Sequence, residues 1–181
     1  MIDSFYTKSE LKELGFKMIG DNVKISRFAR FYSPNLISIG NNVRIDDFCL
    51  LSGDITLKNY IHISAFCALY GGGGIEMDDY SGLSPRCTLL SASDDFSGEF
   101  LIGPMVDVKY TNVTRGKITI KKYSQIGAGC VILPNITIEE GVAVGAMSLI
   151  TSCLKEFSIY AGVPAKFMKP RKREMTNLLP K

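Results

Sequence analysis

The stretch "IGAGCVILPNITIEEGVAVGAMSLIT", residues 126–151, places an aliphatic side chain at every sixth position. The series consists of Ile126, Ile132, Ile138, Val144 and Ile150. One aliphatic residue in six fits neither an amphipathic helix nor the two-residue alternation of a long strand. It is typical of short strands separated by turns and coiled into a solenoid, in which neighbouring coils share one core.

The same rhythm covers most of the chain. Successive unit starts lie 20, 18, 20, 43 and 18 residues apart, so the basic unit is 18 residues, or three hexapeptides. The interval of 43 is one unit plus an insertion of 25 residues that begins near Asp94. The units start at Ile19, Ile39, Leu57, Met77, Ile120 and Ile138.

The cysteines support this register independently. Four of the five occur ten residues after the start of their unit, where the first and last coils carry Ala29 and Ser148. We expect an inward ladder of small side chains that stay reduced. A zinc site needs paired Cys-x-x-Cys spacing, which is absent, and Cys153 lies outside the ladder without an assigned role. The ladder cysteines are Cys49, Cys67, Cys87 and Cys130.

Three segments follow from these patterns. Residues 1–18 contain a short helix, because Thr7 and Glu10 form a capping box and Gly15 is a stop signal. Residues 19–152 form the solenoid, with a loop over about residues 92–116. Residues 153–181 form a turn followed by a basic helix or tail.

Composition limits the class of protein. A chain of 181 residues with 46% hydrophobic residues can bury the core of one domain. The start "MIDSFYTKSE" lacks the features of a secretion signal, and no apolar run is long enough to cross a bilayer. We therefore expect a cytoplasmic protein without a membrane span. The net charge is only +3, and the basic cluster "AKFMKPRKR", residues 165–173, suits a small anionic ligand at least as well as nucleic acid.

The repeats, followed by "IYAGVPAKFMK" at residues 159–169, resemble the hexapeptide-repeat acyltransferases. The resemblance extends over about residues 19–169. It is strongest to the branch containing galactoside, maltose and polysaccharide O-acetyltransferases. It implies an all-β fold, the left-handed parallel β-helix, assembled as a homotrimer. It also implies that acetyl-CoA and the acceptor bind between neighbouring chains.

Six positions match the cofactor contacts of the resembling enzymes. The small residues among them leave the backbone open to a pantetheine arm, and the lysines match the phosphate contacts, which a lysine makes as a point charge. Ser152 stands where the family often has lysine. The matched positions are Ala128, Ala146, Thr151, Ser152, Lys166 and Lys169.

The candidates for catalysis are His62 and Asp94. In the resembling enzymes the general base is a loop histidine, and aligning "TLLSASDDF", residues 88–96, puts Asp94 in its place. An ordinary carboxylate is a poor base toward a sugar hydroxyl, whereas an amine acceptor demands far less. His62 is the only histidine, and imidazole is the usual general base near neutral pH.

The expected geometry joins the two candidates across subunits. We place turns near positions five, eleven and seventeen of each unit, counted from zero, which puts His62 and Asp94 at different corners. In a trimer the Asp94 loop of one chain then approaches the His62 edge of its neighbour, with His62 as base and Asp94 as orienter. Acceptor contacts are expected at Asp95, Ser64 and Asp47, the last beside Asp46 in an outward acid pair. The run Gly71–Gly74 is expected to form a turn that lets the acceptor approach.

The leading interpretation is an acetyl-CoA-dependent O-acetyltransferase that modifies a sugar hydroxyl for a surface polysaccharide. The alternative is N-acetylation of a nucleotide-linked amino sugar, which the missing loop histidine favours. The sequence predicts no metal, because a γ-type carbonic anhydrase would need three histidines and the chain has one. A non-catalytic β-helix used for assembly is a third possibility, and such a protein should not bind coenzyme A.

Overall fold

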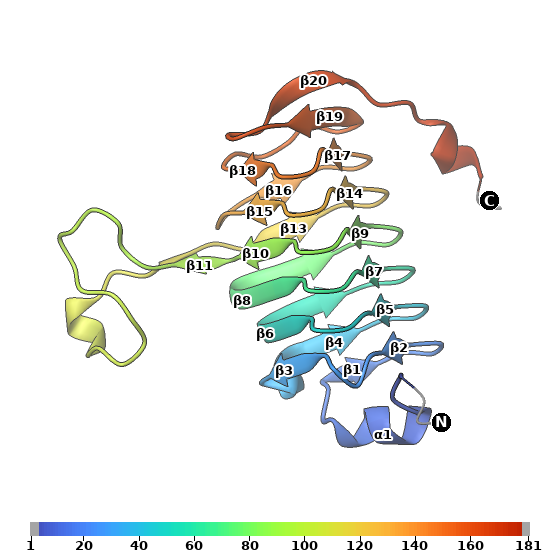
Figure 1. Cartoon of the computed structure of the whole chain (residues 1–181), viewed down its shortest axis with the longest axis horizontal. Coiled ribbons are helices and arrows are strands. Elements are labelled where there is room, and N and C mark those ends of the chain that lie inside the picture. The colour runs from blue at the N-terminus through green and yellow to red at the C-terminus, as the bar shows by residue number, and fades with distance from the viewer. Residues whose placement is uncertain (1–3, 179–181) are drawn as a thin grey trace.

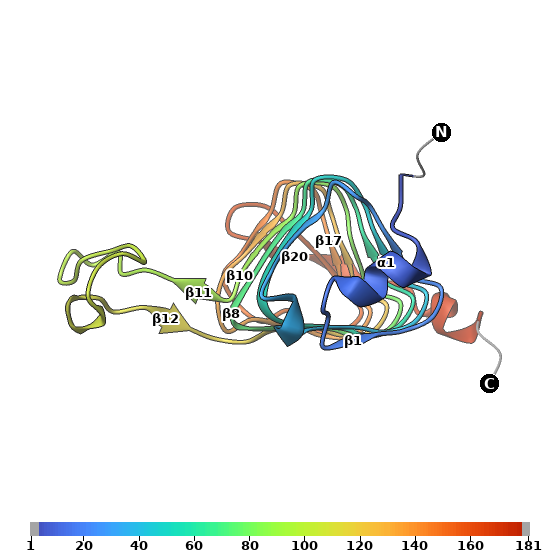
Figure 2. The same ribbon diagram turned by 90° about the horizontal axis from the view of Figure 1, so that it is seen from below.

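The structure, a computed structural model, describes residues 4–178, so residues 1–3 and 179–181 of the expected terminal segments lie outside it. The chain coils into a parallel β-helix with a triangular outline (Figures 1 and 2). One side of the triangle is an eight-stranded sheet in which all pairs are parallel except the last, β19 with β20. Its members are β2 (Lys24–Ile25), β5 (Arg44–Ile45), β7 (His62–Ile63), β9 (Gly82–Leu83), β14 (Gln125–Ile126), β17 (Ala143–Val144), β19 (Ser158–Ala161) and β20 (Lys166–Pro170).

A ten-stranded sheet forms the rest of the solenoid. It is continuous because its two longest strands, β6 (Leu50–Leu57) and β8 (Ala68–Met77), pair with short strands at both of their ends. The short strands are β1 (Met18–Ile19), β3 (Arg30–Tyr32), β4 (Ile37–Ile39), β10 (Thr88–Leu90), β13 (Ile118–Ile120), β15 (Val131–Ile132), β16 (Thr137–Ile138) and β18 (Leu149–Ile150). The helix η1 (Pro34–Leu36) joins β3 to β4.

The core is a set of parallel ladders. Ile45, Ile63, Leu83, Ile126 and Val144 pair in order from β5 to β17, and all are buried. Full burial of one such side chain contributes about 2 kcal/mol. The expected aliphatic register is therefore confirmed, and it sets which side chains face outward.

The cysteine prediction is also confirmed, since Cys49, Cys67, Cys87 and Cys130 are buried free thiols. Each Sγ contacts a backbone carbonyl of the next coil, as when Cys87 donates to the Gly127 oxygen over 3.1 Å. Burial raises the pKa of the Cys130 thiol. These thiols are packing residues of the core, and Cys153 is exposed.

The expected corner positions are wrong. Turns fall at positions three, nine and fifteen of the unit, where Tyr60, Phe66 and Asn135 have positive φ values of 57°, 64° and 62°. His62 consequently lies in the short strand β7, on a flat side of the prism. The left-handed backbone is costly for residues other than glycine, but the corner side chains point outward and stack in columns. One column holds Tyr60, Tyr80 and Tyr123, and another holds Phe28, Phe48 and Phe66.

The expected N-terminal helix is present, but the expected turn and basic helix or tail after residue 152 is wrong, because β19 continues the eight-stranded sheet and the basic cluster lies mostly in strand β20. At the N-terminus α1 (Lys8–Glu13) is capped by Thr7, whose backbone N–H donates to Glu10 Oε2 over 2.7 Å. Gly15 follows with φ of 75°, as expected for a stop. At the C-terminus η3 (Glu174–Asn177) is a 3-10 helix. Among residues 4–178, no helix is long and apolar enough to span a bilayer.

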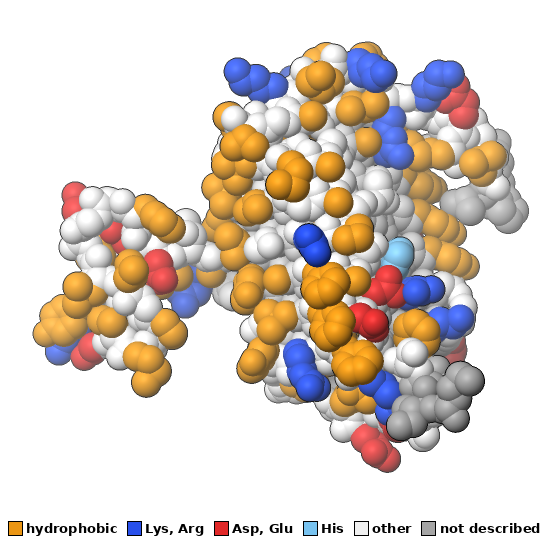
Figure 3. All heavy atoms as spheres, viewed as in Figure 1, with side chains coloured by type: hydrophobic (Ala, Val, Ile, Leu, Met, Phe, Trp, Pro, Cys, Tyr) orange, Lys and Arg blue, Asp and Glu red, His pale blue; other side chains and the backbone are white. Residues whose placement is uncertain are grey.

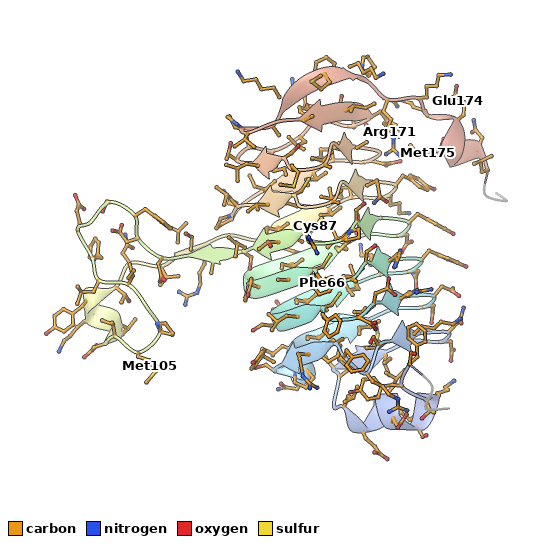
Figure 4. The ribbon with its side chains drawn as sticks, viewed as in Figure 1. Phe66, Cys87, Met105, Arg171, Glu174 and Met175 are labelled. Atoms are coloured by element: carbon orange, nitrogen blue, oxygen red, sulfur yellow. The ribbon has the colours of Figure 1, made fainter. Side chains whose placement is uncertain are left out.

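The insertion leaves the solenoid as a two-stranded ribbon. Strand β11 (Ala92–Ser93) pairs antiparallel with β12 (Thr114–Arg115), and the loop between them, with η2 (Val108–Tyr110), projects far from the coils (Figures 1 and 2). Apolar side chains gather on this loop (Figure 3), and Met105 lies on it well away from the coils (Figure 4). Phe96 and Met105 are 92% and 95% exposed.

The glycine run Gly71–Gly74 lies inside β8, which continues through the third corner of its coil without a break in the strand. The expected unusual backbone is found at Gly74, which has a φ of 92°. Glycine is required at these positions for a steric reason, because both legs of the insertion cross the strand there. A Cβ on Gly73 would lie 2.2 Å from the Ser91 carbonyl oxygen and 2.7 Å from the Gly116 nitrogen. At Gly72 the nearest atom would be Ala92 Cβ at 3.2 Å.

We therefore expect Gly73→Ala to lower the free energy of unfolding by about 3 kcal/mol, because backbone on both sides blocks the new methyl group. Gly72→Ala is the matched control and should cost less than about 1 kcal/mol. Urea unfolding of the two variants measures the difference. Equal stabilities would contradict the crossing described for the insertion.

Candidate active site

The outward side of the eight-stranded sheet carries one continuous row of side chains. Arg44, His62, Gly82, Gln125 and Ala143 pair in register from β5 to β17, each directly before an inward aliphatic residue. Alternation along a strand turns these residues away from the core. Two positions later a second outward row follows, consisting of Asp46, Ser64, Ser84, Gly127 and Gly145.

The N-terminal half of this side is polar and internally hydrogen-bonded. His62 Nε2 lies 2.7 Å from Asp46 Oδ2, and Arg44 Nε donates to Asp46 Oδ1 over 2.6 Å. The imidazole remains 52% exposed. Burial raises the pKa of Asp46, but the hydrogen bonds from Arg44 and His62 outweigh it and hold the pKa below its ordinary value. His62 is thus an oriented, accessible imidazole.

The expected acid pair is already occupied. Asp46 holds Arg44 and His62, and Asp47 accepts a short hydrogen bond from the Ser26 hydroxyl. Farther along the row, Gln125 Nε2 donates to Ser84 Oγ over 3.1 Å. An acceptor contact at Asp47 or Ser64 stays a prediction.

The C-terminal half of the same side is bare. A Cβ on Gly127 would lie 2.6 Å from the Ala146 nitrogen, and one on Gly145 would lie 3.0 Å from Ala161 Cβ. Ala128 and Ala146 occupy the adjoining corner, where the Met147 N–H donates to the Ala128 oxygen over 2.8 Å. The expected small residues therefore adjoin glycines that the close packing of successive coils requires, and these positions carry little or no side chain.

Both expected lysines lie beyond these glycines, on β20. That strand pairs antiparallel with β19, with Ala161 opposite Lys166 and Ile159 opposite Lys169. Because of a register shift within this pair, Lys166 and Lys169 are three residues apart on β20, whereas their partners on β19 are two residues apart. Since Tyr160 points inward, Lys166 and Lys169 share the outward side. Within residues 4–178 neither lysine forms an ion pair.

Thr151 and Ser152 lie elsewhere. They directly follow β18, a strand of the ten-stranded sheet, and both are exposed. The structure thus brings together Ala128, Ala146 and the two lysines along one sheet and its corner, and places Thr151 and Ser152 on the adjacent side of the prism.

Asp94 belongs to a separate cleft at the base of the insertion. This cleft has a volume of about 810 Å³, and its lining includes Gly71, Gly72, Tyr70, Asp94 and Arg115. Within residues 4–178 the Asp94 carboxylate makes no hydrogen bond. The neighbouring Asp95 is used by the loop itself, since it accepts from Ser97 Oγ over 2.9 Å and from the Gly98 N–H over 3.0 Å.

His62 and Asp94 are on different parts of one chain. β7 runs along the side of the prism away from the insertion that carries Asp94 (Figure 1). A single chain therefore does not join them, and their meeting across subunits stays a prediction. Among the described residues no group of three His, Cys, Asp or Glu is arranged to hold a metal ion.

Known proteins match the chain closely. A family model described as "Bacterial transferase hexapeptide (six repeats)" matches residues 117–152. An Escherichia coli protein named dTDP-4-amino-4,6-dideoxy-D-glucose acyltransferase is 39% identical over 97% of this chain and 93% of its own. The chain belongs to the hexapeptide-repeat acyltransferase family. It is an acyltransferase with the left-handed parallel β-helix that the resemblance implied.

Solved structures of AntD, an N-acyltransferase from Bacillus cereus, are similar over nearly the whole length. Its D94A variant, in complex with dTDP and coenzyme A, is 51% identical, with a TM-score of 0.96 over 98% of this chain and 96% of AntD. Its complex with dTDP and 3-hydroxybutyryl-CoA is 52% identical, with a TM-score of 0.95 over 98% and 95%. An Escherichia coli (strain K12) protein named "Putative lipopolysaccharide biosynthesis O-acetyl transferase WbbJ" is only 24% identical over 84% of this chain and 82% of its own. The relatives thus favour the amino-sugar alternative over the leading O-acetylation interpretation.

Sequence reasoning missed Ser84 and Gln125. Ser84 holds the same position of its unit as Asp46 and Ser64, which were both noticed. The signal was therefore available: any polar residue in the two outward rows is a candidate once the direction of the inward aliphatic residues is known.

The Asp46 contacts predict a pH-dependent stability. Because the pKa of Asp46 is depressed on folding, its carboxylate stabilises the fold at pH values above its unfolded pKa, and this stabilisation is lost as pH falls through the lower folded pKa. Asp46→Asn should lower the free energy of unfolding by about 1 to 2 kcal/mol at pH 7. The difference from the unsubstituted protein should shrink steadily in denaturant titrations below the ordinary Asp pKa. A difference that is constant with pH would show that the contacts do not depend on the charge.

Proposed function

We propose that this protein transfers an acyl group from acyl-CoA to the amino group of a dTDP-linked amino sugar, dTDP-4-amino-4,6-dideoxyglucose or a close relative of it. The single observation that carries the proposal is the outward side of the eight-stranded sheet. Among the described residues it has two lysines without an ion pair at one end, glycine and alanine in the middle, and Ser84, Gln125 and His62 at the other. This order suits a thioester whose anionic end is far from its reacting carbonyl.

The chemistry requires little from the protein. The amine nitrogen attacks the thioester carbonyl, a C–N bond forms, the C–S bond breaks, and the thiol of coenzyme A leaves. One proton must leave the nitrogen and one can return to the departing sulfur. A neutral amine attacks without a strong base, so the absence of a histidine at position 94 is no obstacle. We assign hydrogen bonding to the developing oxyanion to the Ser84–Gln125 pair.

His62 and Asp94 complete the proposed site. We infer that assembly as a homotrimer brings the Asp94 loop of one chain to the His62 side of the next. The exposed apolar side chains on that loop support contact with a partner chain, because clustered apolar side chains on a surface mark interaction sites. AntD was solved as D94A and S84A variants, and this chain has Asp94 and Ser84 at those numbers. A cytoplasmic location and use of the product in a surface polysaccharide stay predictions.

The decisive experiment offers matched acceptors. The protein is incubated with acetyl-CoA or 3-hydroxybutyryl-CoA and with dTDP-4-amino-4,6-dideoxyglucose, its 4-hydroxy analogue or the free amino sugar, and products are read by mass spectrometry. We expect acylation of the nucleotide-linked amine only. Transfer to the hydroxyl analogue would restore O-acetylation, and no transfer with any pair would remove the proposed function.

The lysine pair predicts a binding defect. Lys166→Ala combined with Lys169→Ala should weaken coenzyme A binding about tenfold or more, because two phosphate contacts are lost. Lys12→Ala is the control, since it removes an exposed lysine from the distant α1. Calorimetry measures both affinities. Unchanged affinity in the double variant would place the phosphates elsewhere.

Replacing His62 or Asp94 should affect the rate of transfer but not the affinity for coenzyme A. His62→Ala and Asp94→Ala should each reduce acyl transfer about a hundredfold while coenzyme A affinity is retained, because neither side chain lies near the lysines. Glu99→Ala, a loop carboxylate close to Asp94 in sequence, is the control. Steady-state rates alongside calorimetry test this. A fully active His62→Ala enzyme would leave proton removal to solvent.

A further inference from the structure

The strand that carries the two lysines is held at its start, where the N–H of Ala165, directly before the strand, donates to the Leu149 oxygen over 2.8 Å. The ring of Phe167 also packs edge-on against the ring of Tyr160. β20 is the edge strand of its sheet, pairs only with β19, and is exposed along its whole length, Lys166–Pro170. A strand with exposed hydrogen bonds and little buried surface opens readily. The far end of the strand, which carries Lys169, therefore needs a contact of its own to hold a defined geometry.

Arg171, the residue directly after β20, provides such an anchor. Its backbone N–H donates to the Phe157 oxygen over 2.7 Å. Its Nη1 lies within hydrogen-bond distance of three carbonyl oxygens, those of Tyr123 at 2.8 Å, Gly141 at 3.1 Å and Val142 at 3.2 Å. Figure 4 shows Arg171 between the end of β20 and the coils below.

These carbonyls belong to the body of the solenoid. Tyr123 stacks on Tyr80 in a corner column. Gly141 and Val142 form the same corner in the following coil, beside the ring of Phe157. Arg171 therefore ties the edge strand to two successive coils. Burial lowers the pKa of Arg171. The guanidinium nevertheless stays charged at neutral pH, so these contacts are charge-assisted.

We propose that Arg171 is a positioning residue for the acyl donor. It does not reach the donor itself but fixes β20, so that Lys166 and Lys169 meet the phosphates of coenzyme A from one side of the strand. The inference rests on the proposed function. It differs from a purely structural role because only the phosphate-bearing part of the donor depends on it.

The test compares two thioesters on the same enzyme. Acetyl-CoA carries the nucleotide phosphates, whereas acetyl-pantetheine has the same reacting group without them. In Arg171→Gln we expect the KM for acetyl-CoA to rise about tenfold, with kcat near that of the unsubstituted enzyme. The KM for acetyl-pantetheine should change less than about twofold. An equal rise in KM for acetyl-CoA and for acetyl-pantetheine would overturn the proposal.

Two further variants sharpen the result. Arg173→Gln is the matched control, since it removes the same charge from the same segment but contacts Glu156 and the Phe157 ring instead of the coil carbonyls. It should keep the KM for acetyl-CoA. Arg171→Lys, which keeps the charge with fewer donors, should recover part of the affinity, and it replaces the glutamine variant if that one does not fold. A lysine variant as good as arginine would contradict the three-carbonyl anchor.

A non-additivity measurement connects the anchor to the lysines. With Lys166 and Lys169 both replaced by alanine, adding Arg171→Gln should raise the KM for acetyl-CoA no further, because the groups it positions are gone. A further tenfold rise would show that Arg171 acts on something else. If the unsubstituted enzyme transfers no acyl group at all, the proposed function fails. If it is active but Arg171→Gln treats both thioesters alike, only this inference fails.

Discussion

The structure depends on one constraint: equivalent residues of successive coils must lie in register so that their inward side chains form continuous ladders. The backbone hydrogen bonds run from coil to coil, as from the Arg44 N–H to the Ile61 oxygen and from the Gln125 N–H to the Val142 oxygen. A one-residue shift would move every aliphatic side chain of a coil to the surface. The coil length is therefore fixed wherever the core is closed, and extra residues must leave the solenoid or run through a corner.

The site follows from this constraint. Because the inward residues are fixed, the residues between them form equally regular outward rows, and these rows vary without cost to the core. On the eight-stranded sheet they change from charged and hydrogen-bonded side chains near His62 to glycine and alanine near Gly145. The two ends of one sheet therefore differ in side-chain chemistry while sharing one rigid support.

The two departures from the repeat supply what the repeat lacks. The insertion carries Asp94 and an apolar tip away from its own coils, and the glycine run of β8 exists because the two legs of the insertion pass over it. At β20 the chain reverses direction, and this antiparallel strand carries Lys166 and Lys169. The register shift in its pairing with β19 puts both lysines on the same side. The insertion and β20 thus add to the regular coils two of the groups that the proposed function uses.

Periodicity alone determined the solenoid, the inward cysteines and the capped first helix, because each depends on local spacing that the chain displays directly. Resemblance to the family, and not periodicity, marked Ala128, Ala146 and the lysines. The corners were misplaced because a six-residue period fixes the interval between turns but not their phase, which depends on where outward aromatic residues such as Tyr60 and Phe66 stack. The glycine run, the occupied Asp46 and Asp47, the Ser84–Gln125 pair and the Arg171 anchor required the tertiary structure, since each is set by contacts between residues about 16 to 48 positions apart.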